Sequence, residues 1–98
     1  MNSFEHLEFW ITKEIENEIV LKSNHDEGLY HSGSVAAFNR TLSKLKTIST
    51  ENELIEFLEK EIEQCKPYVN DQIIGKHNIG MIAAYKKVLN DLTKENNK

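Results

Sequence analysis

The chain has 98 residues, a formal net charge of −4 and a single cysteine. This length suits one folded domain, and hydrophobic and charged fractions of 39% and 29% argue against a disordered or membrane protein. The lone cysteine excludes an internal disulfide and a cysteine-based zinc site, and the negative charge argues against general binding to nucleic acid or to an anionic membrane.

The first half of the chain predicts two helices. Apolar residues at three- and four-residue steps indicate a helix over about 4–22, which Ser3 can cap. The polar stretch 23–28 predicts a turn, with a second helix from near Leu29. We expect Gly28 to lie outside this helix, because a glycine inside a helix costs about 1 kcal/mol relative to alanine. The apolar stripes contain Leu7, Trp10, Ile11, Ile15 and either Glu18 or Ile19, and then His31, Val35, Phe38, Leu42 and Leu45.

A third helix is expected over about 51–66. Thr50 and Glu53 fit a capping box at its start, and Pro67, which cannot donate a backbone hydrogen bond, is expected to end or kink it. Its apolar face contains Leu54, Phe57, Leu58, Ile62 and Cys65, the last predicted as a buried thiol.

The last helix is expected to begin after a cap at Asn70 or Asp71 and to run to about Lys94. Residues 95–98 are predicted to form a frayed tail. The apolar stripe of this helix contains Ile74, Met81, Ile82, Tyr85, Val88, Leu89 and Leu92.

No segment alternates apolar and polar residues long enough to predict a strand. Because short connections join neighbouring helices in an antiparallel manner, we predict an all-α fold, an antiparallel four-helix bundle built from two tandem helical hairpins. The charge pattern favours this pairing, since the first and third helices are rich in Glu and the second and fourth carry Lys and Arg. Trp10 and Phe57 are expected to anchor the core.

The two halves match each other at an offset of 47 residues without a gap. Small residues, which helical periodicity does not require, are among the identities. We therefore predict an internal duplication, with units over residues 3–48 and 50–95 in a single domain of residues 1–98. The eleven identical pairs are Leu7–Leu54, Lys13–Lys60, Glu14–Glu61, Ile15–Ile62, Glu16–Glu63, Gly28–Gly75, Gly33–Gly80, Ala36–Ala83, Ala37–Ala84, Leu42–Leu89 and Leu45–Leu92.

Each predicted unit carries a patch of small residues on its second helix. Small side chains leave a shallow groove that lets another helix approach closely, so we expect a contact inside the bundle or across a dimer interface. The alternative is a ligand that lies across the two grooves. This small-residue patch consists of Gly33, Ala36 and Ala37 and of Gly80, Ala83 and Ala84.

Histidines and a lysine lie in the two turn regions, residues 24–31 and 71–78. Backbone N–H groups at a helix N-terminus can receive a phosphate or carboxylate. Polar residues are also what helix starts require, so the pattern fits simple turns as well. The ligand hypothesis places a small anion such as a nucleotide on His31, Lys76 and His77, with Gly33 and Gly80 beside them.

Metal and catalytic motifs are weak. His25, Asp26 and His31 lack the spacing of metal-binding motifs, so we expect no metal and no other cofactor. Glu14 and Glu61 come closest to a carboxylate pair, and we expect them to flank a helix interface. The chain is therefore not expected to be an enzyme.

These features predict a small helical interaction protein, an adaptor or inhibitor that binds a protein partner and forms a homodimer through the small-residue patch. The alternative is a module that sequesters or senses a small anionic ligand. Exposed apolar residues would favour a protein partner, whereas convergent cations would favour the ligand. The chain lacks the basic start and apolar centre of a secretory signal, so we expect a cytoplasmic location, and its abundant Lys, Asn and Ile suggest AT-rich coding, as in a phage or mobile-element accessory protein.

Overall fold

Four α-helices make up most of the protein in the computed structural model, which describes residues 4–24 and 28–96. No strand occurs within these ranges. The predicted all-α class and the four-helix bundle are therefore confirmed. The elements are α1 (Glu5–Asn24), α2 (Gly28–Leu45), α3 (Glu51–Cys65), a short 3-10 helix η1 (Lys66–Tyr68) and α4 (Gly75–Asn96).

The residues predicted to start and end α3 do so in the structure. The Thr50 hydroxyl accepts a hydrogen bond from the backbone N–H of Glu53 at 3.2 Å, which caps the helix. At the other end the α-helix stops at Cys65, and the chain tightens into η1 around Pro67.

Two predicted helix starts need correction. Gly28 is the first residue of α2, so the helix begins one residue before the predicted start. The Asp71 carboxylate does accept the backbone N–H groups of Ile73 and Ile74, which lowers its pKa, but it closes a turn and α4 begins only at Gly75. The predicted cap at Ser3 and the turn at 25–27 lie outside the described residues.

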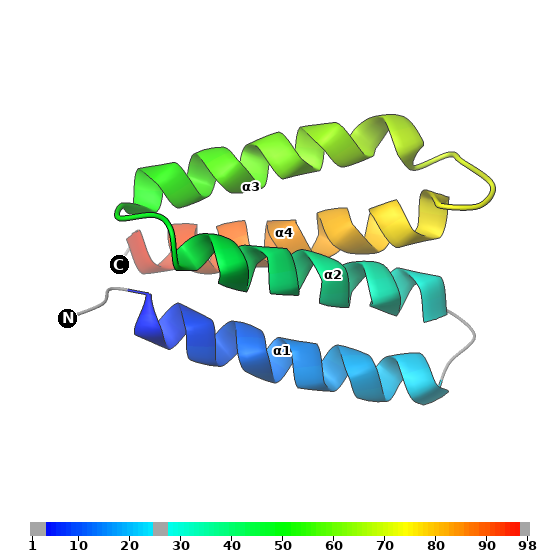
Figure 1. Cartoon of the computed structure of the whole chain (residues 1–98), viewed down its shortest axis with the longest axis horizontal. Coiled ribbons are helices and arrows are strands. Elements are labelled where there is room, and N and C mark those ends of the chain that lie inside the picture. Colours follow the sequence, from blue (N-terminus) through cyan, green and yellow to red (C-terminus); the bar gives the residue numbers. More distant parts are fainter. Residues whose placement is uncertain (1–3, 25–27, 97–98) are drawn as a thin grey trace.

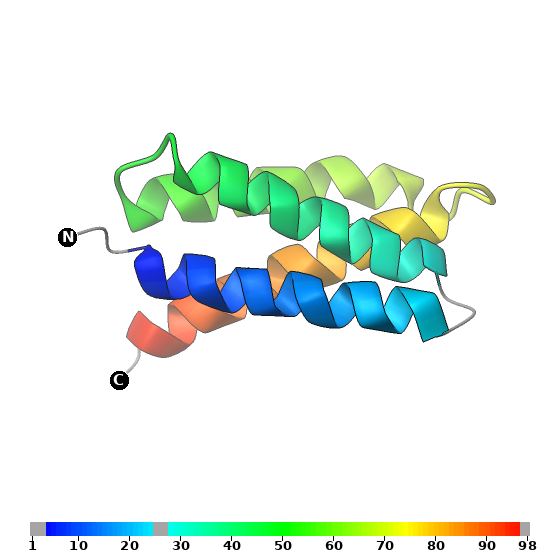
Figure 2. The ribbon, with the colours of Figure 1, turned by 60° about the horizontal axis from the view of Figure 1, so that its bottom comes forward.

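The helices are arranged around the contact between α2 and α4 (Figures 1 and 2). Helix α1 packs mainly on α2, and α3 packs mainly on α4, whereas α2 and α3 barely touch. The C-terminal end of α1, the start of α2, η1 and the start of α4 all lie at the same end of the bundle (Figure 1). We call this the connection end.

Two glycines let α2 and α4 approach closely. A Cβ atom on Gly33 would overlap the backbone carbonyl oxygen of His77, and one on Gly80 would overlap that of Tyr30. The Ser34 hydroxyl also donates to the Gly80 carbonyl oxygen at 3.0 Å. Backbone therefore meets backbone at this crossing, which only glycine permits.

The core lies on both sides of this crossing. Trp10 packs edge to face on Phe38 at 6.3 Å between ring centroids, and Phe57 packs the same way on Tyr85 at 6.2 Å. Both Trp10 and Phe57 are half-buried against the core, as expected of anchors. The largest fully buried side chains are Tyr85, Phe38, Ile11, Leu54, Leu58, Val88 and Thr41.

The apolar stripes predicted from periodicity are mostly right, with one exception at Ile74, and the structure decides the choice that the pattern left open between Glu18 and Ile19. Glu18 is buried at 4% exposure and its neighbour Ile19 is 50% exposed, so the polar residue takes the inward position. Ile74 is 41% exposed, because it lies in the turn before α4 instead of on the helix. Cys65 is buried, as predicted.

Several contacts occur in pairs that are 47 residues apart. The overlap of Gly33 with His77 has its counterpart at Gly80 and Tyr30, and the Trp10–Phe38 ring pair has its counterpart at Phe57 and Tyr85. An internal duplication would produce this reciprocity. The duplication itself stays a prediction.

The close approach of α2 and α4 at Gly33 and Gly80 predicts how alanine substitutions change the stability of the protein. Gly33→Ala and Gly80→Ala should each lower the free energy of unfolding by about 1–3 kcal/mol, because the added methyl group forces two backbones apart. Gly28→Ala is the matched control, since nothing lies within 4 Å of its added Cβ. Thermal unfolding followed by circular dichroism measures all three. Equal melting temperatures for the three variants would contradict the close crossing.

Candidate functional site

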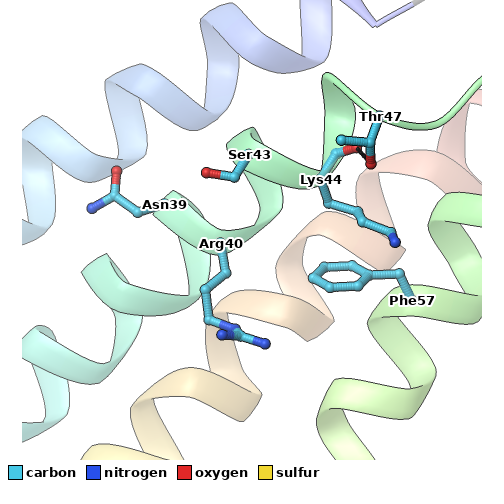
Figure 3. A pocket seen from close by; sticks show the side chains of 6 residues that line it. All are labelled: Asn39, Arg40, Ser43, Lys44, Thr47 and Phe57. Atoms are coloured by element: carbon cyan, nitrogen blue, oxygen red, sulfur yellow. Dashed lines mark hydrogen bonds between the residues drawn. The ribbon is translucent and has the colours of Figure 1, made fainter.

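An open groove lies between α2 and α3. It has a volume of about 540 Å³ and is open to solvent. Four of the six lining residues lie on α2, one follows that helix, and one aromatic ring comes from α3 (Figure 3). They are Asn39, Arg40, Ser43, Lys44, Thr47 and Phe57.

The Arg40 guanidinium is held in place by a buried carboxylate. Its Nε and Nη2 atoms donate to the same oxygen of Glu61, Oε1, at 2.8 and 2.6 Å. The Tyr85 hydroxyl donates to that oxygen at 3.1 Å. These contacts tie α2, α3 and α4 together at one point beside the groove.

The same cluster changes the proton affinity of its members. Burial first and then the Glu61 carboxylate raise the pKa of Tyr85, so its hydroxyl remains a donor well above neutral pH. The hydrogen bond to Glu61 raises the pKa of Arg40. Burial raises the pKa of the nearby Cys65 thiol, so this thiol is a poor nucleophile.

A second buried carboxylate lies between α1, α2 and α4. The Glu18 Oε2 atom is 2.5 Å from His31 Nδ1, and its Oε1 atom is 3.9 Å from Lys87 Nζ. The side chains of Glu18 and His31 are only 6% and 13% exposed. This cluster therefore holds three helices together inside the bundle and offers little surface to a ligand.

The anion site predicted from the turn regions is not assembled as expected. His31 contacts Glu18, whereas Lys76 is exposed and His77 is half-buried on α4. Gly33 and Gly80 are buried against backbone in the α2–α4 crossing, so they present no surface to a ligand.

The small-residue patch is an intramolecular contact. Ala37 and Ala84 are 0% and 1% exposed and belong to the core, and the two glycines lie in the crossing. Only Ala36 and Ala83 are half-buried. Most of the patch is therefore covered within the chain itself.

Glu14 and Glu61, the predicted carboxylate pair, lie in different environments. Glu61 is buried beside Arg40 and Tyr85, while Glu14 is half-buried on α1. Within the described ranges, no group of three or more His, Cys, Asp or Glu side chains could hold a metal ion. His25 and Asp26 lie outside these ranges.

Exposed apolar side chains gather at the connection end. Nine large hydrophobic residues are exposed among the described residues, and only Phe9 lies elsewhere, near the start of α1. Ile73 is 78% exposed. We call the other eight residues the apolar end: Ile19, Val20, Leu21, Leu29, Tyr68, Ile73, Ile74 and Ile79.

Comparison of the chain with protein families, with curated proteins and with solved structures gave no match. None of the helices in the described part of the chain is long and apolar enough to cross a membrane.

Reasoning from the sequence missed both the groove and the apolar end. One signal for the apolar end was present: Ile73 and Ile74 lie in a turn between Asp71 and Gly75, where polar residues are the rule. The cluster of Arg40, Glu61 and Tyr85 had no comparable signal, because its members lie 21 and 24 residues apart on three helices.

The Tyr85 hydroxyl should matter for stability. Tyr85→Phe removes a donor to a buried carboxylate and should lower the free energy of unfolding by about 1.5 kcal/mol at neutral pH. Tyr68→Phe is the control, because that ring is 51% exposed. Urea unfolding measures both.

The effect of Tyr85→Phe should depend on pH. The folded state keeps the Tyr85 proton above the ordinary pKa of about 10, whereas the unfolded state loses it there. The contribution of the hydroxyl is thus complete below about pH 10 and falls as the pH rises further. The stability gap between the original protein and Tyr85→Phe should narrow above that pH, and a constant gap would contradict the raised pKa.

Proposed function

We propose that the protein binds a protein partner through the apolar end, as an adaptor or inhibitor that does no covalent chemistry. The observation that carries the proposal is the concentration of exposed apolar side chains there. Single exposed hydrophobic residues are normal on a soluble domain, but a gathered set rimmed by polar residues is typical of an interaction surface.

The size of the connection end suits one partner. The protein measures 42 × 28 × 26 Å, so a face across its long axis covers about 700 Å². A specific protein interface of standard size takes about 800 Å² from each partner. Burying one exposed isoleucine or leucine side chain contributes about 1.5–3 kcal/mol, so a few residues of the apolar end provide the gain that a stable contact needs.

The surroundings of the predicted anion-binding residues also favour a protein partner over a small anionic ligand. A small anion at the turn regions requires His31, Lys76 and His77 to converge, yet His31 is engaged by a buried carboxylate. The exposed isoleucines of the same region have no charge or hydrogen-bond donor with which to bind an anion. They suit an apolar groove or helix on a partner.

Site-specific photocrosslinking tests the proposal. A photoreactive phenylalanine at position 73 or 79 should form an adduct with one partner protein in cells that make this chain, because both side chains are exposed at the apolar end. The same group at position 9 is the matched control, since Phe9 is 59% exposed but lies outside the apolar end.

A substitution makes the test specific. Leu29→Ser should abolish the adduct at position 73 while leaving the melting temperature unchanged, because Leu29 is 53% exposed. Equal adducts at positions 9, 73 and 79, or an adduct that survives Leu29→Ser and Ile79→Ser together, would argue against binding through this surface.

A further inference from the structure

Four exposed side chains lie along one face of α1, which packs mainly on α2 and forms an edge of the bundle (Figure 1). Phe9 and Val20 are each 59% exposed. Between them, the side chains of Lys13 and Glu16 are 59% and 62% exposed. The four residues follow one another at steps of four, three and four, which is the spacing of the contact positions in a coiled coil. We call these four residues the α1 seam.

The contacts that Lys13 makes within its own chain are weak. Its Nζ atom lies 3.7 Å from Glu16 Oε2 and 5.4 Å from the centroid of the Phe9 ring. An exposed ion pair between neighbouring turns of a helix contributes little to stability, because water competes for both charges. Both charged side chains can therefore turn toward a second helix at little cost.

The α1 seam is complementary to itself in the antiparallel direction. A two-fold axis midway between Lys13 and Glu16 sets Lys13 of each copy against Glu16 of the other. The same alignment sets Phe9 of each copy against Val20 of the other. Opposite charges thus meet at the centre, and apolar side chains meet at both ends. A parallel alignment would set lysine against lysine and glutamate against glutamate, so the charges oppose it.

The corresponding positions on α3 and η1 lack the apolar residues. The residues 47 positions after the α1 seam are Glu56, Lys60, Glu63 and Pro67, and all four are exposed. They repeat the lysine and the glutamate, but neither apolar residue. The same two charges are therefore present on this face without an apolar contact at either end, which provides a matched control.

We propose that two copies of the protein form a dimer through the α1 seam, with the two α1 helices antiparallel about a two-fold axis. Lys13 and Glu16 select the direction and the alignment of the helices, as charged residues at contact positions do in coiled coils. Phe9 and Val20 provide the favourable burial of apolar surface. This inference goes beyond the proposed function, because Ile73 and Ile79 of the apolar end take no part in the α1 seam.

The length of α1 sets the strength of this dimer. The helix has 20 residues, so it is about 30 Å long, and a contact strip about 10 Å wide covers roughly 300 Å² of each copy. A standard interface takes about 800 Å² from each partner. We therefore expect a weak dimer, with a dissociation constant on the order of 100 μM.

Sedimentation equilibrium of the full chain from about 10 μM to about 1 mM tests the dimer. The original protein should be mainly dimeric at the upper concentration. Lys13→Glu and Glu16→Lys should each raise the dissociation constant at least about tenfold, because like charges then face each other at the centre. An equimolar mixture of the two variants should form dimers again, because the mixed dimer sets a glutamate against a lysine at both central positions.

Matched variants separate the α1 seam from net charge and from apolar surface in general. Lys60→Glu changes the net charge as Lys13→Glu does, but on α3, and should leave the dissociation constant unchanged. Phe9→Ser should weaken the dimer, whereas Leu29→Ser should not, since Leu29 is 53% exposed but lies outside the α1 seam. All these side chains are exposed, so circular dichroism should give the same melting temperature for every variant.

Three results would overturn the inference. A monomer at about 1 mM would exclude the dimer. Equal weakening by Lys13→Glu and Lys60→Glu would assign the effect to net charge, and a variant mixture that stays monomeric would exclude the antiparallel alignment. None of these results bears on the crosslinking test of the apolar end. A second copy captured by a photoreactive group at position 9 gives an adduct with the mass of two chains, which distinguishes it from an adduct with another protein.

Discussion

The close crossing of α2 and α4 determines the positions of everything else in the protein. Gly33 and Gly80 let the two backbones meet, so α2 and α4 form the centre and α1 and α3 lie to either side. With α2 committed to α4, its contact with α3 is slight, and a groove opens between them. The two glycines thus determine which helices pack closely, and they affect the groove through the position that this packing gives to α2 relative to α3.

Two buried carboxylates then join the outer helices to the central pair. Glu61 on α3 accepts hydrogen bonds from Arg40 on α2 and Tyr85 on α4, and Glu18 on α1 meets His31 on α2. Burying an ion pair adds little net stability, because desolvation opposes the attraction, but losing one partner of a buried pair is costly. These clusters therefore favour one alignment of the helices over others, and the one at Glu61 also fixes the direction of the Arg40 side chain.

The sequence allowed much of the fold to be predicted, because helices and caps depend on neighbouring residues. Thr50 with Glu53 marked the start of α3, and Pro67 marked its end. Periodicity identified the inward face of each helix, but not which helix would lie against it. The small-residue patch therefore remained open to several interpretations, and the structure shows it inside the α2–α4 contact. The anion site was sought among residues close in sequence, whereas the cluster of Arg40, Glu61 and Tyr85 is brought together from three helices.

The apolar end and the groove lie far apart along α2. Leu29 and Lys44 lie on the same helix, 15 residues apart, which at 1.5 Å per residue is about 22 Å along its axis. Coupling between the two surfaces would require α2 to shift, since it is the element common to both. The α2–α4 crossing opposes such a shift, because a sliding helix would bring side chains where only glycine fits. The crossing therefore keeps the spacing between the apolar end and the groove fixed.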